Sequence, residues 1–164
     1  MSEPVHDDQV RDEGRDVARA WHRRFAVECN NRAWDLSVQP RTPLQDREML
    51  DCAHASAWHW DKIGSELNRM RAVTLLAEVH AQLGFGRSAL AFAQTMSDFF
   101  AQRGETEAWE RAITSAVEAH AAHAGGDMAR HGAAHARAVL ALAGIDDEED
   151  RAIVFKTFAQ VPTP

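Results

Sequence analysis

Apolar residues recur along this chain every three or four positions, which is the spacing of an amphipathic α-helix. Alternating apolar and polar runs, typical of a half-buried strand, do not occur. Glycine and proline divide the chain into helix-sized intervals, because both residues interrupt helices. The pattern therefore predicts an all-α fold. Helices are expected near residues 15–39, 44–63, 65–83, 87–103, 106–124, 127–143 and 147–160.

Several predicted helices begin with a residue that caps helices. Thr42 stands before Pro43, a proline suited to the first helical position, and Ser65 stands before the third helix. Asp146 is expected to open the seventh helix, and the acidic residues after it complement the positive end of the helix dipole. These signals support the predicted boundaries.

The apolar stripes predict how the helices pack. We expect the first helix to bury one continuous stripe, which consists of Val17, Trp21, Phe25, Cys29 and Leu36. The stripe of the third helix is broader, so this helix should contact neighbours on two sides. Such a helix is typical of a middle layer in a stack of helical hairpins.

Residues 70–103 place large, small and glycine residues in a recurring order. The positions that define this order are Leu76, Ala77, His80, Gly84, Ala89 and Ala93. Their spacing resembles a tetratricopeptide repeat, in which small residues let two helices approach closely. Residues 111–143 resemble a second, degenerate copy. Its matching positions are Val117, Ala121, the Gly125-Gly126 turn, Ala129, Ala133 and Ala136.

The two copies also depart from the family pattern. The turn glycines Gly84 and Gly125 are 41 residues apart, against about 34 in the family. Ala101 replaces the usual proline, and Glu118 replaces a small residue. The stretch 52–60 is also similar to short bacterial tetratricopeptide-like proteins. The resemblance implies antiparallel hairpins stacked in a right-handed superhelix, a scaffold that serves many functions.

Composition narrows the class of protein. The 164 residues include 18 basic and 25 acidic side chains, and the net charge of -7 argues against nucleic-acid and anionic-membrane partners. No apolar run is long enough to span a membrane, and two cysteines are too few for a disulfide framework. We therefore expect a cytoplasmic protein, with a flexible acidic tail at 1–14 and a single helical domain at 15–160.

A polar face on the third predicted helix is the candidate partner groove. In stacked hairpins the first helix of each repeat faces the concave surface, where peptides or partner helices bind. A solvated helix face with a network among Arg71, Thr74 and Glu78 is the alternative. An exposed tryptophan from the second helix would complete the groove. The groove residues are Asn68, Arg71, Glu78 and Trp58.

The histidines suggest a second kind of site. His131 and His135 have the i, i+4 spacing at which two imidazoles can share a metal, and His120 and His123 lie on the preceding helix. No Asp or Glu on the same face orients these rings, so core packing is the competing interpretation. We expect no resident cofactor, and zinc or nickel only as adventitious ligands. Buried neutral imidazoles predict a loss of stability below about pH 5.5.

Enzyme chemistry finds little support. Cys52 with His54 could form a nucleophilic pair, but Cys52 borders an apolar stripe, which favours an inert thiol. The chain has no phosphate-binding glycine loop and no nucleophile elbow. The sequence thus predicts a non-enzymatic module that binds an unknown protein or peptide partner. The alternative is a small-ligand or metal-binding domain that uses the histidines of 106–143.

Self-association is also expected, because a short helical array exposes an apolar end. The seventh helix presents Ile153, Phe155 and Phe158 and could cover that end or form the contact of a homodimer.

Overall fold

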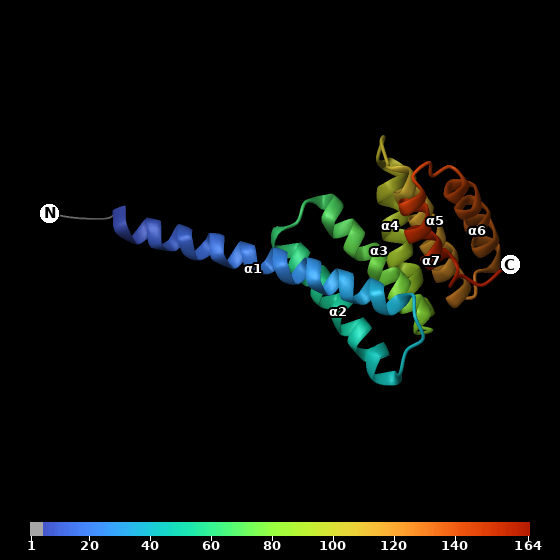
Figure 1. Ribbon diagram of the computed structural model, residues 1–164, viewed down its shortest axis with the longest axis horizontal. Coiled ribbons are helices and arrows are strands. Elements are labelled where there is room, and N and C mark those ends of the chain that lie inside the picture. The colour runs from blue at the N-terminus through green and yellow to red at the C-terminus, as the bar shows by residue number, and fades with distance from the viewer. Residues whose placement is uncertain (1–4) are drawn as a thin grey trace.

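The computed structural model describes residues 5–164, with side chains from residue 14 onward, and its regular structure is α-helical without strands. The all-α prediction is confirmed for this part of the chain (Figure 1). The helices are α1 (Val5–Ser37), α2 (Pro43–Ile63), α3 (Glu66–Gln82), α4 (Gly86–Gln102), α5 (Ala108–Ala124), α6 (Met128–Ala143) and α7 (Glu148–Phe158).

Two of the helix starts are capped as predicted. The side chain of Thr42 accepts a hydrogen bond from the backbone of Gln45, whose side chain bonds back to the Thr42 backbone. Ser65 and Asn68 form the same reciprocal box at the start of α3. Each box satisfies backbone donors that have no partner within the helix. The start of α7 differs by one residue from the prediction, because Asp147 rather than Asp146 is the capping residue.

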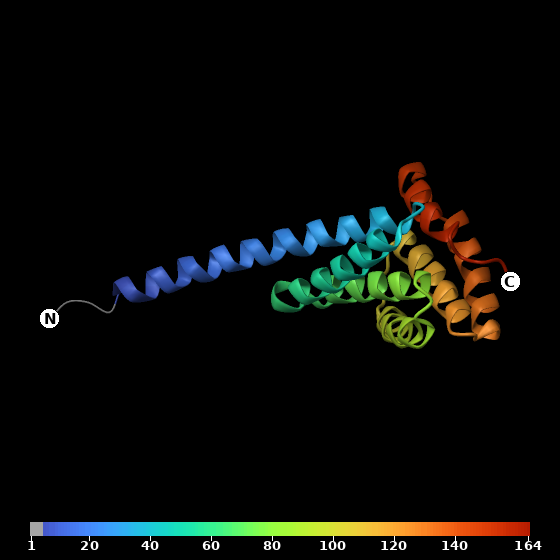
Figure 2. The same ribbon diagram turned by 90° about the horizontal axis from the view of Figure 1, so that it is seen from below.

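The first helix is much longer than predicted. It begins at Val5, ten residues before the expected start, so residues 5–14 of the expected tail are helical, and residues 1–4 lie outside the described residues. Every side chain from Gly14 to Trp21 is exposed. Figures 1 and 2 show this half of α1 extending away from the other helices. The polar composition of the segment therefore reflects the absence of a neighbouring helix rather than the absence of helical structure.

The predicted apolar stripe of α1 is buried only toward its C-terminal end. Leu36 is fully buried, whereas Val17, Trp21 and Phe25 are 57%, 49% and 40% exposed. The prediction was wrong for these three residues. Val17 and Trp21 precede His22, where the first ring contacts with α2 occur. Phe25 does contact α2, through the ring of His59, but that contact leaves it partly exposed.

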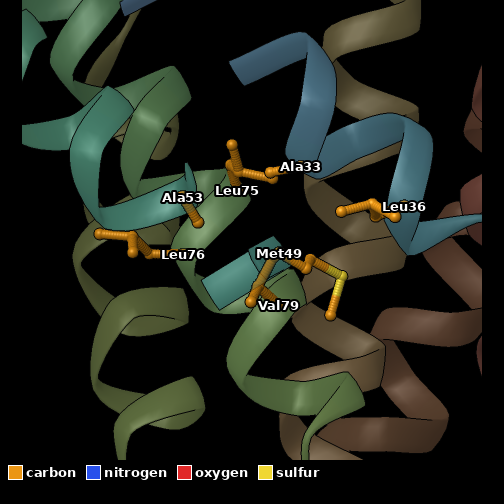
Figure 3. Packing of buried hydrophobic residues seen from close by; sticks show 7 residues of the cluster. All are labelled: Ala33, Leu36, Met49, Ala53, Leu75, Leu76 and Val79. Atoms are coloured by element: carbon orange, nitrogen blue, oxygen red, sulfur yellow. The ribbon is translucent and has the colours of Figure 1, made fainter. Parts of the chain in front are cut away.

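Helices α3 and α5 occupy the centre of the bundle. Consecutive helices pack in the pairs α1 with α2, α3 with α4, and α5 with α6; α3 also contacts α1 and α5, and α5 contacts α7. The cluster in Figure 3 joins α1, α2 and α3. A second cluster, rich in alanine, joins α3, α4 and α5. The broad stripe of the third helix therefore packs on two sides, as expected.

The turns after α3 and α5 have the same geometry. Gly84 and Gly126 both have positive φ, at 74° and 79°, which favours glycine because it has no Cβ. Phe85 donates its backbone N–H to the carbonyl of His80, and Asp127 donates to that of Ala122, five residues back in both cases. The equivalent glycine in the second turn is therefore Gly126, not Gly125.

This one-residue shift corrects the second predicted repeat. Ala129, Ala133 and Ala136 of α6 are exposed, although they were assigned to the packed face. The buried positions of α6 are instead His131, Ala134 and Ala138. Counted from the turn glycines, His131 and the half-buried His135 occupy the places that Ala89 and Ala93 occupy in α4.

The start of α4 packs directly on the end of α5. A Cβ added at Gly86 would lie 2.1 Å from the carbonyl oxygen of Ala124. That oxygen belongs to the backbone, so it cannot move away as the end of a flexible side chain could. We expect Gly86→Ala to lower the free energy of unfolding by about 2 kcal/mol or more, measured by urea denaturation.

Gly132 provides the matched control, because it also lies in a helix but has nothing near its missing Cβ. Gly132→Ala should raise stability by up to about 1 kcal/mol, since alanine favours the helix. Equal effects of the two substitutions would contradict the close approach of α4 and α5.

Candidate functional site

The polar face of α3 lies in the interior of the bundle. Thr74 is buried and Glu78 is 0% exposed, because α1 and α5 both pack against this side of α3. The alternative of a solvated helix face is therefore wrong for Thr74 and Glu78, whereas the Arg71 side chain is 40% exposed. Polar groups inside a protein need partners, since an unpaired buried charge is costly in free energy.

The Glu78 carboxylate receives its hydrogen bonds from two directions. His120 Nδ1 of α5 lies 3.0 Å from Oε1 and 3.1 Å from Oε2 of Glu78. Gln82 Nε2 donates to Oε1 at 2.8 Å and also to the carbonyl of Ser37 at the end of α1, again at 2.8 Å. These bonds link α1, α3 and α5 through one buried group. An acidic side chain does orient a histidine, but it comes from a different helix.

The pair changes how readily His120 takes up a proton. Burial by itself would lower the pKa of His120, but the charge of Glu78 and its hydrogen bond outweigh that effect and raise the pKa above its usual value. When the imidazole is protonated, its charge and that of the Glu78 carboxylate stabilise one another in the interior.

A second ion pair connects α3 to α5. Arg71 Nε donates to Glu110 Oε1 at 2.7 Å, and the Glu110 side chain is almost completely buried. The Arg71 guanidinium also lies over the ring of Trp109, 5.1 Å from its centroid. A cation held between a carboxylate and an aromatic face has little freedom to move. The Arg71 side chain is thus held in place against α5.

The Arg71–Glu110 pair borders a pocket of about 470 Å³ between α1, α3, α4, α5 and α7. The volume falls within the usual range for ligand sites. Apolar atoms provide most of the lining surface, although eight of the fifteen lining residues are polar: three threonines, one asparagine and four charged residues. The residues that define its walls are Trp34, Arg71, Phe100, Trp109, Ile113 and Thr114. Ile153, Val154 and Thr157 of α7 close one side.

The structure brings only one of the four predicted groove residues to this pocket. Arg71 lines it, Asn68 caps α3, and Glu78 is buried beside His120. Trp58 is exposed, but it lies on the surface of α2 against His22 of α1. The four residues therefore belong to four different environments and do not form one groove.

Sequence reasoning missed Trp34, Trp109 and Glu110. One signal was available for the carboxylate, because Glu110 shares a helix face with Ile113 and Val117, which are apolar. An acidic residue on an apolar stripe indicates a buried partner of opposite charge. That partner is Arg71, which lies 39 residues earlier in the sequence. The pairing depends on the packing of α3 on α5.

The histidines of α5 and α6 interact with different groups. His120 bonds Glu78, and His131 Nδ1 donates to the carbonyl of Ala119 at 2.9 Å. The rings of His123 and His135 lie 5.1 Å and 6.0 Å from that of His131. Among the residues whose side chains are described, no group of three or more His, Cys, Asp or Glu is arranged to bind a metal. The predicted set does not converge on one point.

The other histidines form pairs between helices. His22 of α1 and His59 of α2 approach to 2.8 Å between their Nδ1 atoms. His54 of α2 and His80 of α3 approach to 3.1 Å between their Nε2 atoms. Burial lowers the pKa of His59 and of His80, and in each pair the partner imidazole lowers it further.

The two cysteines interact with each other rather than with a histidine. Cys29 of α1 and Cys52 of α2 are both half-buried, and burial raises the pKa of each thiol. A nucleophilic cysteine needs the opposite shift, because the thiolate is the reactive form. His54, the predicted base, bonds His80 instead.

Comparisons with protein-family models, with curated proteins and with solved structures found no match to this chain. Within residues 5–164, no helix combines the length and the apolar character that a membrane span requires.

Replacing His120 tests the buried pair. His120→Ala removes the imidazole that bonds both oxygens of Glu78, and we expect the free energy of unfolding to fall by about 3 kcal/mol. Because the pKa of His120 is raised in the folded protein, the stabilisation is fully present below the usual histidine pKa. It is lost as pH rises through the folded value. Urea unfolding should therefore show a larger loss near about pH 6 than near about pH 9.

Gln82→Ala is the matched control for this experiment, since it removes a partner of the same carboxylate that does not titrate. Its cost should vary less with pH. A His120→Ala cost that is equal at both pH values would argue against a charged pair.

Acid should destabilise the protein through His59 and His80. Their folded pKa values are lowered, so the unfolded chain takes up protons first as pH falls below about 6.5. Stability then decreases until the folded pKa is reached. His80→Phe keeps a ring beside Phe85 and Phe92 but removes the titration. We expect its thermal midpoint to depend less on pH between about 7.5 and 5 than that of the wild type.

Ser88→Ala separates the titration from the hydrogen bond, because Ser88 Oγ lies 2.7 Å from His80 Nδ1. This variant should be less stable at every pH and should keep the pH dependence of the wild type. A His80→Phe profile with unchanged slope would remove His80 from the acid response.

Proposed function

We propose that this chain is a protein-interaction module that binds a short apolar segment of a partner protein in the pocket between α1, α3, α5 and α7. The observation that supports this function best is the pocket itself, a cavity of about 470 Å³ with aromatic walls. Pockets of this size with a few placed polar groups are the usual form of a binding site.

We further propose that the helices form a tetratricopeptide-like stack of antiparallel hairpins. The pairs α1–α2, α3–α4 and α5–α6 would be the hairpins, and α7 would cover the end. Two observations support this arrangement. The first helix of each pair contacts the first helix of the next pair, and the turns of the second and third pairs share their glycine geometry. In such a stack the first helices line the concave surface, and α1, α3 and α5, the first helices of the three pairs, all contribute residues to the pocket.

The lining favours a segment with apolar side chains and little net charge. Asp35 and Glu110 are balanced by Arg71 and Lys156, and the Arg71–Glu110 pair is already formed. A charged side chain would lose its hydration on entering the pocket, and two of the four lining charges, Arg71 and Glu110, are already paired with each other. Aromatic walls instead provide contact area for an aliphatic or aromatic anchor, which is how most binding energy arises at such sites.

The alternative of a metal site in 106–143 receives less support. His120 is bonded to Glu78, and the remaining imidazoles do not converge with it. The proposed module therefore uses the pocket rather than the histidines for binding.

Selection from a peptide library tests this proposal when a pocket-filling variant is screened in parallel. Thr114 lines the pocket, and its hydroxyl donates to the carbonyl four residues earlier, that of Glu110. Thr114→Trp would fill the cavity without removing a tertiary hydrogen bond. Peptides selected on the wild type should bind this variant more than about tenfold more weakly in a titration.

Thr95 of α4 is the matched control, because its hydroxyl also bonds the carbonyl four residues earlier and its side chain is exposed outside the pocket lining. Thr95→Trp should bind the peptides as the wild type does. Peptides that bind all three proteins equally, or a library that yields no binder, would refute the pocket as the interaction site.

A further inference from the structure

Contacts between side chains define which positions of α1 and α2 face each other. His22 Nδ1 of α1 lies 2.8 Å from His59 Nδ1 of α2. Nearer the loop that connects the two helices, Arg32 of α1 forms an ion pair with Glu48 of α2, with 2.7 Å between Nε and Oε1. Facing positions therefore rise in number along α1 as they fall along α2.

The two cysteines of the chain lie between these contacts and in the same register. Cys29 follows His22 by seven residues, and Cys52 precedes His59 by seven. Seven residues are close to two helical turns, so each cysteine lies on the same helix face as its histidine. The two thiols accordingly form a side-chain hydrogen bond with each other.

The thiols are close together and also within reach of a small molecule. One turn away, the buried Ser56 donates a hydrogen bond to the carbonyl of Ala26 at 2.8 Å, so α1 and α2 approach closely here. A disulfide needs such an approach, because its two Cα atoms are usually about 4.4–6.8 Å apart. Cys29 and Cys52 are both half-buried, which leaves part of each side chain at the surface.

We propose that Cys29 and Cys52 are a site of reversible oxidation, at which a low-molecular-weight disulfide such as oxidised glutathione converts the two thiols into a disulfide between α1 and α2. The bond links positions that are 23 residues apart in the sequence. It adds a second covalent connection between two helices that are otherwise joined through residues 38–42. The site is independent of the pocket and of the function proposed for it.

The hydrogen bond between the thiols determines the order in which they react. Burial raises the pKa of both, but the hydrogen bond from the Cys52 S–H lowers the pKa of Cys29, whereas the same bond raises that of Cys52. Cys29 is therefore the first of the two to lose its proton. Its thiolate attacks one sulfur of the small disulfide, whose S–S bond breaks and releases one thiolate.

The second step closes the disulfide within the chain. Cys52 gives up its proton to water, and its sulfur attacks the Cys29 sulfur, so that the second small thiolate leaves. In total the two protein thiols lose two hydrogens, and one small disulfide is reduced to two thiols. The first step is slow, because burial keeps the thiolate fraction low. The second is fast, because the contact between the side chains gives Cys52 a high effective concentration at Cys29.

Mass spectrometry of the full chain after incubation with oxidised glutathione tests the proposal. The wild type should lose the mass of two hydrogen atoms and carry no glutathione. Peptide mapping without reduction should find the peptide that contains Cys29 joined to the peptide that contains Cys52. The Cys52→Ser variant should instead keep glutathione on Cys29, because the thiol that displaces it is missing.

The matched control combines Asp51→Cys with Cys52→Ser. It moves the thiol by one residue, to an exposed position that faces a different direction on α2. The Asp51 carboxylate makes an exposed ion pair with Arg47, at 3.7 Å, so its loss should leave the fold intact. This variant should carry glutathione on both cysteines and form no internal disulfide.

The disulfide should also stabilise the folded protein. A bond across a loop of this length restricts the unfolded chain, and we expect oxidation to raise the thermal midpoint of the wild type by about 5 °C or more. Reduction with dithiothreitol should reverse the increase. The control variant should show no such increase after the same treatment.

Three results would overturn the proposal. The first is a wild type that carries glutathione in place of the internal disulfide, or whose two thiols stay free. The second is an internal disulfide that forms to the same extent in the control variant, since chain flexibility rather than packing would then bring the thiols together. The third is a disulfide that lowers the thermal midpoint, because the bond would then distort the packing of α1 on α2.

Discussion

The buried carboxylate of Glu78 constrains how the central helices can pack. A carboxylate with no exposure to water is stable only if hydrogen bonds replace its hydration, and those bonds come from His120 of α5 and Gln82 of α3. Gln82 also bonds the end of α1 through the carbonyl of Ser37. A shift of any of these three helices would leave a charge or a polar group unpaired. The relative positions of α1, α3 and α5 are therefore fixed more tightly than apolar contacts alone would fix them.

The pocket is a consequence of that arrangement. Its walls come from the same three helices, together with Phe100 of α4 and one face of α7. On the pocket side, the Arg71–Glu110 pair repeats the principle of the Glu78–His120 pair, since each joins a side chain of α3 to one of α5. Rigid walls reduce the free energy that a ligand must spend on ordering its site. The polar row of α3 thus connects the stability of the bundle to the shape of its cavity.

Sequence patterns predicted the existence of the helices well, because breakers and caps act locally. Thr42 and Ser65 mark helix starts through contacts within three residues. The burial of Glu78, on the polar face of α3, was not predictable from such local contacts. A helical projection shows that Glu78 lies opposite the apolar stripe, but not that His120, 42 residues later, packs against it. The interior of this bundle uses both faces of α3, which the pattern of a single helix cannot reveal.

Two other differences between the sequence predictions and the structure have the same origin. The stripe at Val17 and Trp21 is apolar in sequence, yet its exposure depends on where α2 ends. In α6 the packed face depends on which glycine of the Gly125-Gly126 turn takes the positive φ, and the answer, Gly126, moves His131 into the core. Each outcome follows from a neighbouring element rather than from the residues that the pattern contains.

Binding in the pocket can be observed most directly through the tryptophan indole signals in a proton–nitrogen correlation spectrum. Trp34 and Trp109 line the pocket, whereas Trp21 and Trp58 are exposed on α1 and α2. Addition of a selected peptide is predicted to shift the signals of Trp34 and Trp109 and to leave those of Trp21 and Trp58 unchanged. Shifts confined to Trp21 and Trp58 would contradict binding between α1, α3, α5 and α7.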